Sequence, residues 1–246
     1  MSLVTSSENF LHLIERDIPR SVKITPHINP YAAGSVIIEY GRTKVHITVN
    51  VQESVPQFLK GRGTGWITAE YAMLPGSTHD RIDRDRKGVS GRAHEIQRLI
   101  GRSLRSVIDL TKIGERTIFI DCDVLIADGG TRTAAITGGY VALELAIKKL
   151  LKERVIQENP LKCRVAGISV GITENGKIIT DLDYEEDSSC ETDMNVVMTS
   201  DDRFVEVQGT AEGEPFTDQY LQALLFAAKK SLKEIFKVQE AILNLN

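Results

Sequence analysis

The sequence predicts an α+β protein in which helices pack on sheets. Runs rich in β-branched residues come in bunches, whereas segments with the helical spacing of apolar residues are interposed singly. Hydrophobic residues make up 41% and charged residues 26% of the 246 residues, which excludes a chain that is disordered throughout. No stretch rich in proline and serine divides the chain, so we expect a single domain over residues 1–246.

The first elements follow from local patterns. In order, we expect a helix at 5–16, a hairpin of strands at 35–40 and 45–51, a short strand at 66–71 and a helix at 90–108. The capping-box spacing of Thr5 and Glu8 indicates the first helix. The string Gly41-Arg42-Thr43 between two β-branched runs indicates the hairpin. Ile96, Leu99, Ile100, Leu104 and Val107 recur at helical spacing and indicate the second helix.

The later elements have equally local signals. We expect a strand at 117–125, a helix at 131–153, strands at 164–173, 194–199 and 203–208, and a last helix at 217–240. The Gly-rich turn 128–130 opens the long helix, and Asp201-Asp202 is the turn signal between the last two strands. The last helix has an apolar stripe that runs from Leu221 to Ile235.

Positive charge is concentrated between residues 81 and 105. That segment holds eight Lys or Arg residues against three Asp or Glu residues, a net charge of +5 in a chain whose total is -4. Arg81, Arg84 and Arg86 precede the expected helix in a loop, and Arg92 falls at the helix start, where free N–H groups and the helix dipole favour anions. The pattern favours a polyphosphate or a nucleic-acid backbone as partner, and the alternative is a solvated helix face.

The string DGGTRT at 128–133 is a second candidate anion site. Glycines allow a close approach of the backbone to a ligand, while Thr131 offers a hydroxyl and Arg132 a fork of donors at the start of a long helix. The alternative is a capped helix after a tight turn. Taken together with the basic segment, the two interpretations carry equal weight.

An acidic stretch at 181–193 holds seven carboxylates and no basic residue. Asp187 is expected on a loop, and Asp193 at the edge of the strand that follows it. Paired carboxylates beside a phosphate site are a common way to hold Mg²⁺. One of the two could instead act as a general acid, and the plain alternative is a surface loop.

Several other classes of protein are disfavoured. A P-loop NTPase needs a GxxxxGK[ST] loop, which the chain lacks. The five histidines show no metal-ligand spacing, and the three cysteines form no CxxC pair, which disfavours a zinc site and a disulfide framework. The first residues have neither a basic nor an apolar region of a signal peptide, and no apolar run reaches about 18 residues. We therefore expect a reduced, cytoplasmic protein without a membrane span.

Longer strings show a resemblance to a known family. They read FLKGRGTGWITAEYAMLPGSTHDR (58–81), SGRAHEIQRLIGRSLR (90–105), GERTIFIDCDVLIADGGTRTAAITGGYVAL (114–143), DLDYEEDSSCETDMNVVMT (181–199) and FVEVQGTAEGEPF (204–216). In content and order they are similar to the bacterial ribonuclease PH family, the phosphate-dependent tRNA nucleotidyltransferases. The resemblance covers about 34 to 216, most of the chain.

The resemblance implies a fold, an assembly and an activity. The fold is the ribosomal protein S5 domain 2-like, RNase PH-type fold, with βαβ units and helices packed on sheets. The assembly is a homohexameric ring, a trimer of dimers. The activity is phosphorolytic 3′→5′ exoribonuclease action: inorganic phosphate attacks the 3′-terminal phosphodiester of RNA and releases a nucleoside diphosphate. Precursor tRNA, and in some bacteria ribosomal RNA, is the implied substrate.

Roles for single residues are also implied by the resemblance. Arg92, Gly130, Thr131 and Arg132 would bind phosphate, and the arginines of loop 81–87 would hold the RNA backbone. Asp187 and Asp193 would be the catalytic acidic pair, with two roles open: ligands of Mg²⁺ or another divalent ion, which we favour, or protonation of the leaving 3′ oxygen.

The chain departs from the family in three places. The Arg-Pro-Asp-Gly-Arg-like string that usually begins the family is missing, an Arg commonly stands where this chain has Gly76, and Asp80 adds negative charge to the same loop. These changes bear on RNA affinity. They keep open the alternative of a non-catalytic RNA-binding subunit of an exosome-like ring, although such subunits tend to lose the acidic pair or the phosphate arginine, and this chain keeps both.

Overall fold

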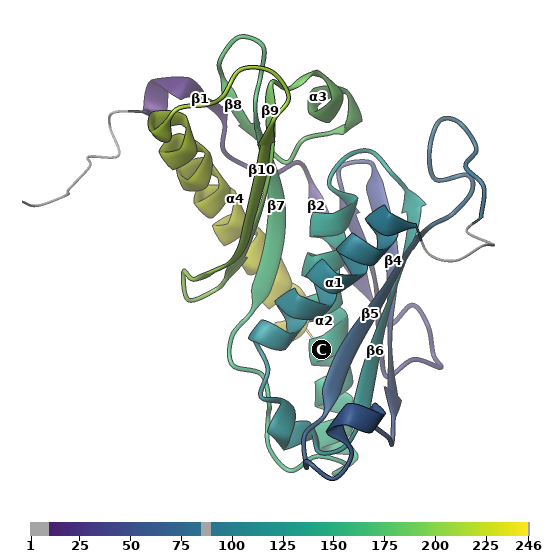
Figure 1. Ribbon diagram of the computed structural model, residues 1–246. Coiled ribbons are helices and arrows are strands. Elements are labelled where there is room, and N and C mark those ends of the chain that lie inside the picture. The colour runs from purple at the N-terminus through teal and green to yellow at the C-terminus, as the bar shows by residue number, and fades with distance from the viewer. Residues whose placement is uncertain (1–9, 85–89, 246) are drawn as a thin grey trace, which may run out of the picture.

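Two five-stranded sheets enclose one long helix (Figure 1). The structure is a computed structural model, and it describes residues 10–84 and 90–245. The strands of one sheet are, in spatial order, β2 (Val22–Pro26), β3 (Gly34–Tyr40), β4 (Thr43–Gln52), β6 (Thr117–Ile126) and β5 (Trp66–Met73). Those of the other are β1 (Ile14–Arg16), β8 (Ile178–Thr180), β7 (Val165–Ile172), β9 (Thr192–Thr199) and β10 (Phe204–Ala211). The predicted arrangement of helices on sheets is confirmed.

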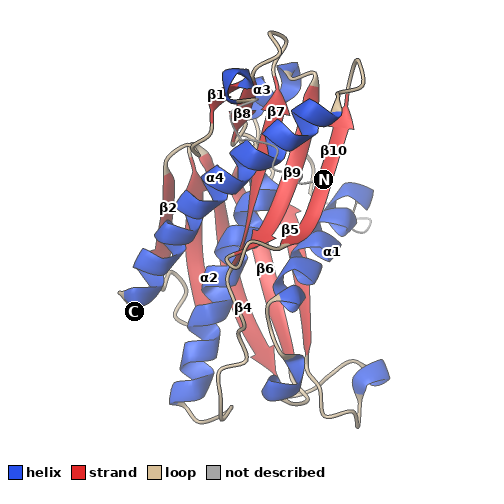
Figure 2. Ribbon diagram, turned by 90° about the vertical axis from the view of Figure 1, so that its left-hand side faces the viewer, coloured by secondary structure: helices blue, strands red, loops and turns tan. Residues whose placement is uncertain are grey.

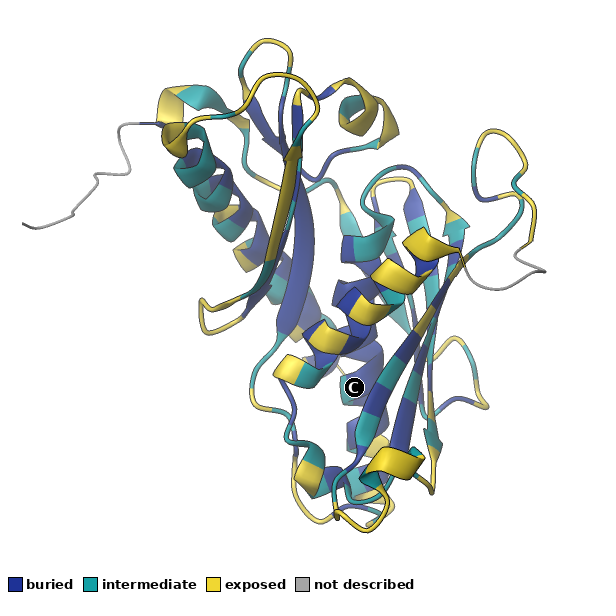
Figure 3. Ribbon diagram, viewed as in Figure 1, coloured by how far each residue is buried: buried dark blue, intermediate teal, exposed yellow. Residues whose placement is uncertain are grey.

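Helix α2 (Thr131–Lys152) lies at the centre of the molecule, between the two sheets. The helices are α1 (Gly91–Ser106), α2 (Thr131–Lys152), α3 (Tyr184–Ser189) and α4 (Asp218–Asn244). Helix α2 contacts β3 and β4 of one sheet and β7 of the other, and Figure 2 shows it behind α4. Buried residues occur on every side of α2, as expected of a helix between two layers (Figure 3). Strand β7 is buried along its whole length because α2 and α4 both pack against it.

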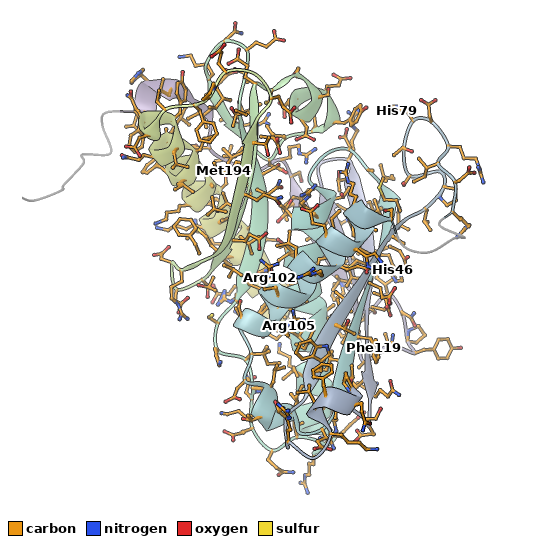
Figure 4. The ribbon with its side chains drawn as sticks, viewed as in Figure 1. His46, His79, Arg102, Arg105, Phe119 and Met194 are labelled. Atoms are coloured by element: carbon orange, nitrogen blue, oxygen red, sulfur yellow. The ribbon has the colours of Figure 1, made fainter. Side chains whose placement is uncertain are left out.

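Helix α1 joins the two sheets along their open side. It packs on β5 and α2 through a buried stripe that includes Ile96, Leu99 and Leu104. Its exposed face reaches the other sheet, where the guanidinium of Arg102 (labelled in Figure 4) donates to the Glu206 carboxylate of β10 at 2.6 Å. The C-terminal half of α1 is therefore held near the edge strand of the second sheet.

The predicted helix at 5–16 is wrong where the structure describes it. Residues 5–9 lie outside the described residues; Leu11–Leu13 form a single 3₁₀ turn, and Ile14–Arg16 form strand β1. Strand β1 pairs in parallel with β8, with Ile14 opposite Ile178. A segment this short has few hydrogen bonds to gain as a helix, so pairing with a distant strand decides its structure.

The acidic stretch contains a helix where a loop was predicted. Asp187 lies in α3, which begins with a capping box: the Asp183 side chain accepts from the Glu186 backbone N–H, and the Glu186 side chain accepts from the Asp183 backbone N–H. The predicted strands and helices elsewhere are present with ends shifted by a few residues, and β2 and β8 are additional. Among the described residues, no helix combines the length and the hydropathy that a membrane span needs.

Candidate active site

The string at 128–133, which the sequence indicated as a phosphate-binding site, forms a tight turn at the start of α2. Gly129 and Gly130 both have positive φ, +73° and +66°, so each occupies a conformation that other residues rarely adopt. A Cβ on Gly129 would lie 2.2 Å from the carbonyl oxygen of Leu182. The turn therefore lies directly against the backbone that leads into α3. Thr131 and Arg132 follow as the first two residues of the helix.

A tyrosine of β5 contacts this turn. The hydroxyl of Tyr71 lies 2.8 Å from the hydroxyl of Thr131. Burial raises the pKa of Tyr71, although the hydrogen bond to Thr131 and the charges of Arg92 and Arg132 oppose the shift. Tyr71 therefore stays protonated at neutral pH, and it lies close enough to both arginines to interact with them electrostatically.

Arg92 lies in the first turn of α1, which begins at the N-cap Ser90. The Ser90 side chain accepts from the backbone N–H of Ala93 at 3.2 Å. A cavity of about 460 Å³ opens here, between the end of β5 and the loop that follows it. Its lining includes Tyr71, Arg84, Arg92 and Asp123. The start of α1 thus supplies an arginine and free helix N–H groups to a cavity that an anion can enter.

Arg132 is held from two other elements. Its guanidinium lies 4.0 Å from the carboxylate of Glu95 on α1 and 3.5 Å from the side-chain oxygen of Gln208 on β10. The amide of Gln208 in turn donates to Glu95 at 3.1 Å. These contacts tie the start of α2 to α1 and to the second sheet.

Helix α3, which contains Asp187 and is followed by the strand that contains Asp193, lies at the same end of the molecule as the starts of α1 and α2 (Figure 1). Met194, labelled in Figure 4, is buried, so its neighbour Asp193 projects from the other face of β9. Desolvation and then repulsion from Asp193 raise the pKa of Asp187, and the charges of Arg132 and Arg92 oppose this rise. The pKa of Asp187 thus responds to Asp193 and to both arginines, so each of these three groups lies close enough to Asp187 to interact with it electrostatically.

The loop arginines differ in their placement. Arg84 lines the cavity with Arg92, whereas Arg81 is exposed and paired with Asp83 at 3.0 Å. Arg86 lies outside the described residues. The structure thus places Arg84 on the same cavity as Arg92, and Arg81 stays a predicted RNA contact that is engaged with a neighbouring carboxylate.

Sequence reasoning missed the ion pairs that support the site. The Arg20 guanidinium bonds both carboxylate oxygens of Asp181, and Arg42 bonds the carboxylate of Asp128 at 2.9 and 3.1 Å. Arg16 bonds the Glu186 carboxylate of α3 at 2.7 and 2.6 Å. These partners are distant in the sequence, so no local spacing indicates them. Tyr71 had one signal, an inward position in the alternation of β5.

The donors present fit a magnesium ion that keeps part of its water. Among the described residues, no group of three or more His, Cys, Asp or Glu side chains could enclose a metal. Mg²⁺ seldom needs such a cage, since one or two carboxylates, water and substrate phosphate oxygens complete its octahedron. Asp187 and Asp193, which repel each other electrostatically, are the two carboxylates that would hold such an ion, and Arg92 and Arg132 also act on Asp187.

Two five-stranded sheets around a central helix, together with matches to both RNase PH family models, define an α+β protein of the RNase PH type. The chain belongs to the 3′ exoribonuclease family. The family model for domain 1 matches residues 19–148, and that for domain 2 matches residues 163–231. Arg92 and the turn before α2 fall in the first match, and Asp187 and Asp193 fall in the second.

Solved structures share the fold over most of the chain. The crystal structure of rice (Oryza sativa) Rrp46 is 18% identical, with a TM-score of 0.73, covering 93% of this chain and 97% of that chain. The Archaeoglobus fulgidus exosome with RNA bound to its active site contains a chain that is 22% identical, with a TM-score of 0.73 and 89% of each chain covered. A chain of an archaeal exosome core is 21% identical, with a TM-score of 0.69, covering 91% of this chain and 88% of that chain.

Proposed function

We propose that this protein is a phosphorolytic 3′→5′ exoribonuclease of the bacterial ribonuclease PH kind, which trims 3′-terminal nucleotides of precursor tRNA in the cytoplasm. Inorganic phosphate is the co-substrate, and a nucleoside diphosphate is the product. Ribosomal RNA is a further substrate of the same chemistry. The observation that carries the proposal is the cluster of Arg92, Arg132, Asp187 and Asp193, two cations for phosphate beside two carboxylates.

The arginines answer the main physical obstacle of the reaction. Phosphate and RNA are both anions and repel each other. Arg92 and Arg132, each at the start of a helix, offset that repulsion at about 1.5–3 kcal/mol for each charged hydrogen bond. The neutral hydroxyls of Tyr71 and Thr131 add hydrogen-bonding groups at the same place.

The reaction exchanges one P–O bond for another. An oxygen of inorganic phosphate attacks the phosphorus of the last phosphodiester, and the bond to the 3′ oxygen of the preceding nucleotide breaks. The leaving 3′ oxygen takes up a proton, and the terminal nucleotide departs with two phosphates. Asp187 is suited to hold that proton because its pKa is raised.

Asp187 and Asp193 are equally suited to hold Mg²⁺ or another divalent ion. A bound divalent ion would neutralise charge on the phosphate groups. In either role, the carboxylates act on a substrate that the arginines hold in place. Both family domains are needed, since each supplies half of these groups.

A homohexameric ring, a trimer of dimers, is the proposed assembly. Strand β10 is the edge of its sheet and carries two apolar side chains, Phe204 and Val207, that are each 42% exposed. An edge strand with exposed apolar residues is suited to a protein interface. Size-exclusion chromatography with light scattering should give a molar mass of six times the 27.3 kDa of the chain.

The test of the activity is phosphate dependence. The purified protein is incubated with a tRNA that carries extra 3′ nucleotides, with Mg²⁺, in the presence and absence of inorganic phosphate. We expect nucleoside diphosphates to form only in the reaction that contains phosphate. Equal shortening without phosphate, or nucleoside monophosphates as products, would refute phosphorolysis.

One observation favours the alternative, a non-catalytic RNA-binding subunit of an exosome-like ring. Arg132 is engaged by Glu95 and Gln208, so a cation proposed for phosphate has partners within the chain. RNA binding without any product, with phosphate and Mg²⁺ present, would support this alternative. The variants Asp187→Asn and Asp193→Asn separate the two functions. If the protein is the enzyme, both variants should lose trimming. If it is a non-catalytic subunit, both should bind RNA as the wild type does.

A further inference from the structure

The segment between β1 and β2 crosses from one sheet to the other. Strand β1 pairs with β8, and β2 pairs with β3 of the opposite sheet. Arg20 lies on this crossing with a side chain that is 14% exposed. Its backbone N–H donates to the carboxylate of Asp181 at 2.9 Å.

The guanidinium of Arg20 uses two of its edges at once. Nε and Nη2 donate to the two carboxylate oxygens of Asp181 at 3.0 and 2.9 Å, and Nη1 donates to the backbone carbonyl of Asp128 at 2.8 Å. Asp181 is fully buried. A planar fork can meet a carboxylate and a carbonyl in fixed directions, whereas the single ammonium of a lysine cannot hold both in this geometry.

The two partners of Arg20 begin the two segments that carry the site. Asp128 precedes the turn that leads to Thr131 and Arg132, and Asp181 precedes the capping residue of α3, which carries Asp187. A Cβ on Gly130 would lie 3.5 Å from Nη2 of Arg20 and 3.6 Å from the Asp181 carboxylate. The turn thus rests on the ion pair, and the ion pair rests on the strand that leads to the acidic helix.

We propose that Arg20 is a positioning residue for phosphorolysis, which fixes the separation between the phosphate-binding turn and the carboxylate-bearing helix. This inference rests on the proposed function. Arg20 acts through the residues that it holds. A displacement of about 1 Å between reacting groups can cost about 100-fold in rate, so a small loss of this contact should be visible in kcat.

The variant Arg20→Lys tests the role, because a lysine keeps a positive charge against the buried carboxylate and allows folding. Arg164→Lys is a matched control: Arg164 also joins a carboxylate and a carbonyl, those of Glu240 and Phe236, but at α4 and away from the site. For Arg20→Lys we expect kcat to fall by about 10- to 100-fold, with the KM for RNA unchanged. For Arg164→Lys we expect kcat to stay within about 2-fold, because Glu240 and Phe236, which its side chain contacts, lie on α4 and are not among the proposed site residues. An unchanged kcat in Arg20→Lys, or equal losses in both variants, would overturn the proposal.

A measurement without turnover separates this inference from the proposed function. Amide hydrogen exchange should quicken in α3 and at the start of α2 in Arg20→Lys, and stay at the wild-type rate there in Arg164→Lys. Absence of phosphorolysis in the wild-type protein would refute the proposed function. Unchanged exchange in α3 of Arg20→Lys would refute the positioning role of Arg20, whatever the wild-type activity.

Discussion

The hydroxyl of Tyr71, near the end of β5, lies 2.8 Å from the hydroxyl of Thr131, the first residue of α2. This contact joins the edge strand of one sheet to the helix start that carries the phosphate-binding candidates. Because burial raises the pKa of Tyr71, its hydroxyl keeps its proton at neutral pH and can donate to Thr131 or to a bound anion.

Tyr71→Phe should therefore weaken phosphate use while preserving the fold. We expect a loss of about 1 kcal/mol in the free energy of unfolding, from one hydrogen bond, and a rise of several-fold in the KM for phosphate. Denaturant unfolding and steady-state kinetics measure the two effects. Tyr31→Phe is the control, since that side chain is 93% exposed and should change neither quantity. An unaltered KM for phosphate in Tyr71→Phe would contradict a role at the phosphate site.

Arg92→Ala should raise the KM for phosphate more than it weakens RNA binding. The lost charged hydrogen bond is worth about 1.5–3 kcal/mol, which corresponds to about 10- to 100-fold. Phosphate titrations of the trimming rate and RNA binding without phosphate are the two measurements. Arg98→Ala, at an exposed position further along the same helix, controls for loss of charge on α1. Equal losses in phosphate use and RNA binding would refute the assignment of Arg92 to phosphate.

Gly129→Ala should be far more harmful than its backbone conformation alone explains. Gly61 has a similar φ, +77°, with nothing within 4 Å of an added Cβ, so Gly61→Ala measures the strain alone, about 1–2 kcal/mol. At Gly129 the Cβ would also meet the Leu182 carbonyl oxygen at 2.2 Å. The melting temperature should therefore fall clearly further in Gly129→Ala, with loss of trimming. Similar melting temperatures for the two variants would show that turn and acidic helix are not in contact.

Asp183→Ala should disturb catalysis through α3. The side chain of Asp183 caps the helix by accepting from the backbone N–H of Glu186 at 2.9 Å, and loss of such a cap costs about 1 kcal/mol. Thr217→Ala removes the cap of α4, so it should destabilise the chain by a similar amount. We expect kcat to fall in Asp183→Ala alone. A parallel fall in both variants would mean that kcat follows global stability.

Asp187 should make the stability of the metal-free chain depend on pH. Its pKa is raised above the ordinary 3.8, so the folded chain holds this proton more tightly than the unfolded chain does. Asp187 therefore contributes nothing to the free energy of unfolding below pH 3.8. It lowers that free energy as the pH rises from 3.8 through the raised pKa. Asp187→Asn removes that destabilisation, so the variant should melt higher than the wild type at neutral pH and equally at low pH. Melting curves with a chelator check this, and a lower melting temperature of the variant at neutral pH would contradict it.

If Asp187 and Asp193 hold Mg²⁺, added Mg²⁺ should make the wild type melt at a higher temperature than Asp187→Asn. Binding to the folded state raises the melting temperature of the wild type in proportion to the occupancy of the site. Asp187→Asn and Asp193→Asn should lose that response. An equal response to Mg²⁺ in all three proteins would place the ion elsewhere and leave Asp187 as a proton donor.

Local patterns in the sequence predicted the elements whose structure is decided locally. The turn before α2 is an example, because two glycines and a following helix are contiguous in the chain. Strand β1 was mistaken for a helix because its partner, Ile178 opposite Ile14, is contributed by a distant part of the chain. Helix α3 was missed since six residues are too few to show an apolar period.

The candidate site divides in the same way. Arg92, Arg132, Asp187 and Asp193 lie in strings that resemble a known family, and the structure gathers them. Arg20 lies outside those strings, and Tyr71 lies in one but was given no role there, because the partners of Tyr71 and Arg20 are 60 and 161 residues away in the sequence. Those contacts exist only after both sheets have formed around α2.

The site is divided between the two family domains, and this division sets an order of events on the ribosome. A growing chain contains Arg92 and Arg132 well before it contains Asp187 and Asp193. Domains tend to fold as units, the N-terminal one first during synthesis. The turn before α2 rests on the ion pair of Arg20 with Asp181, so it lacks that support until the second domain has been made. The proposed site is thus complete only once the second domain has been made and has folded against the first.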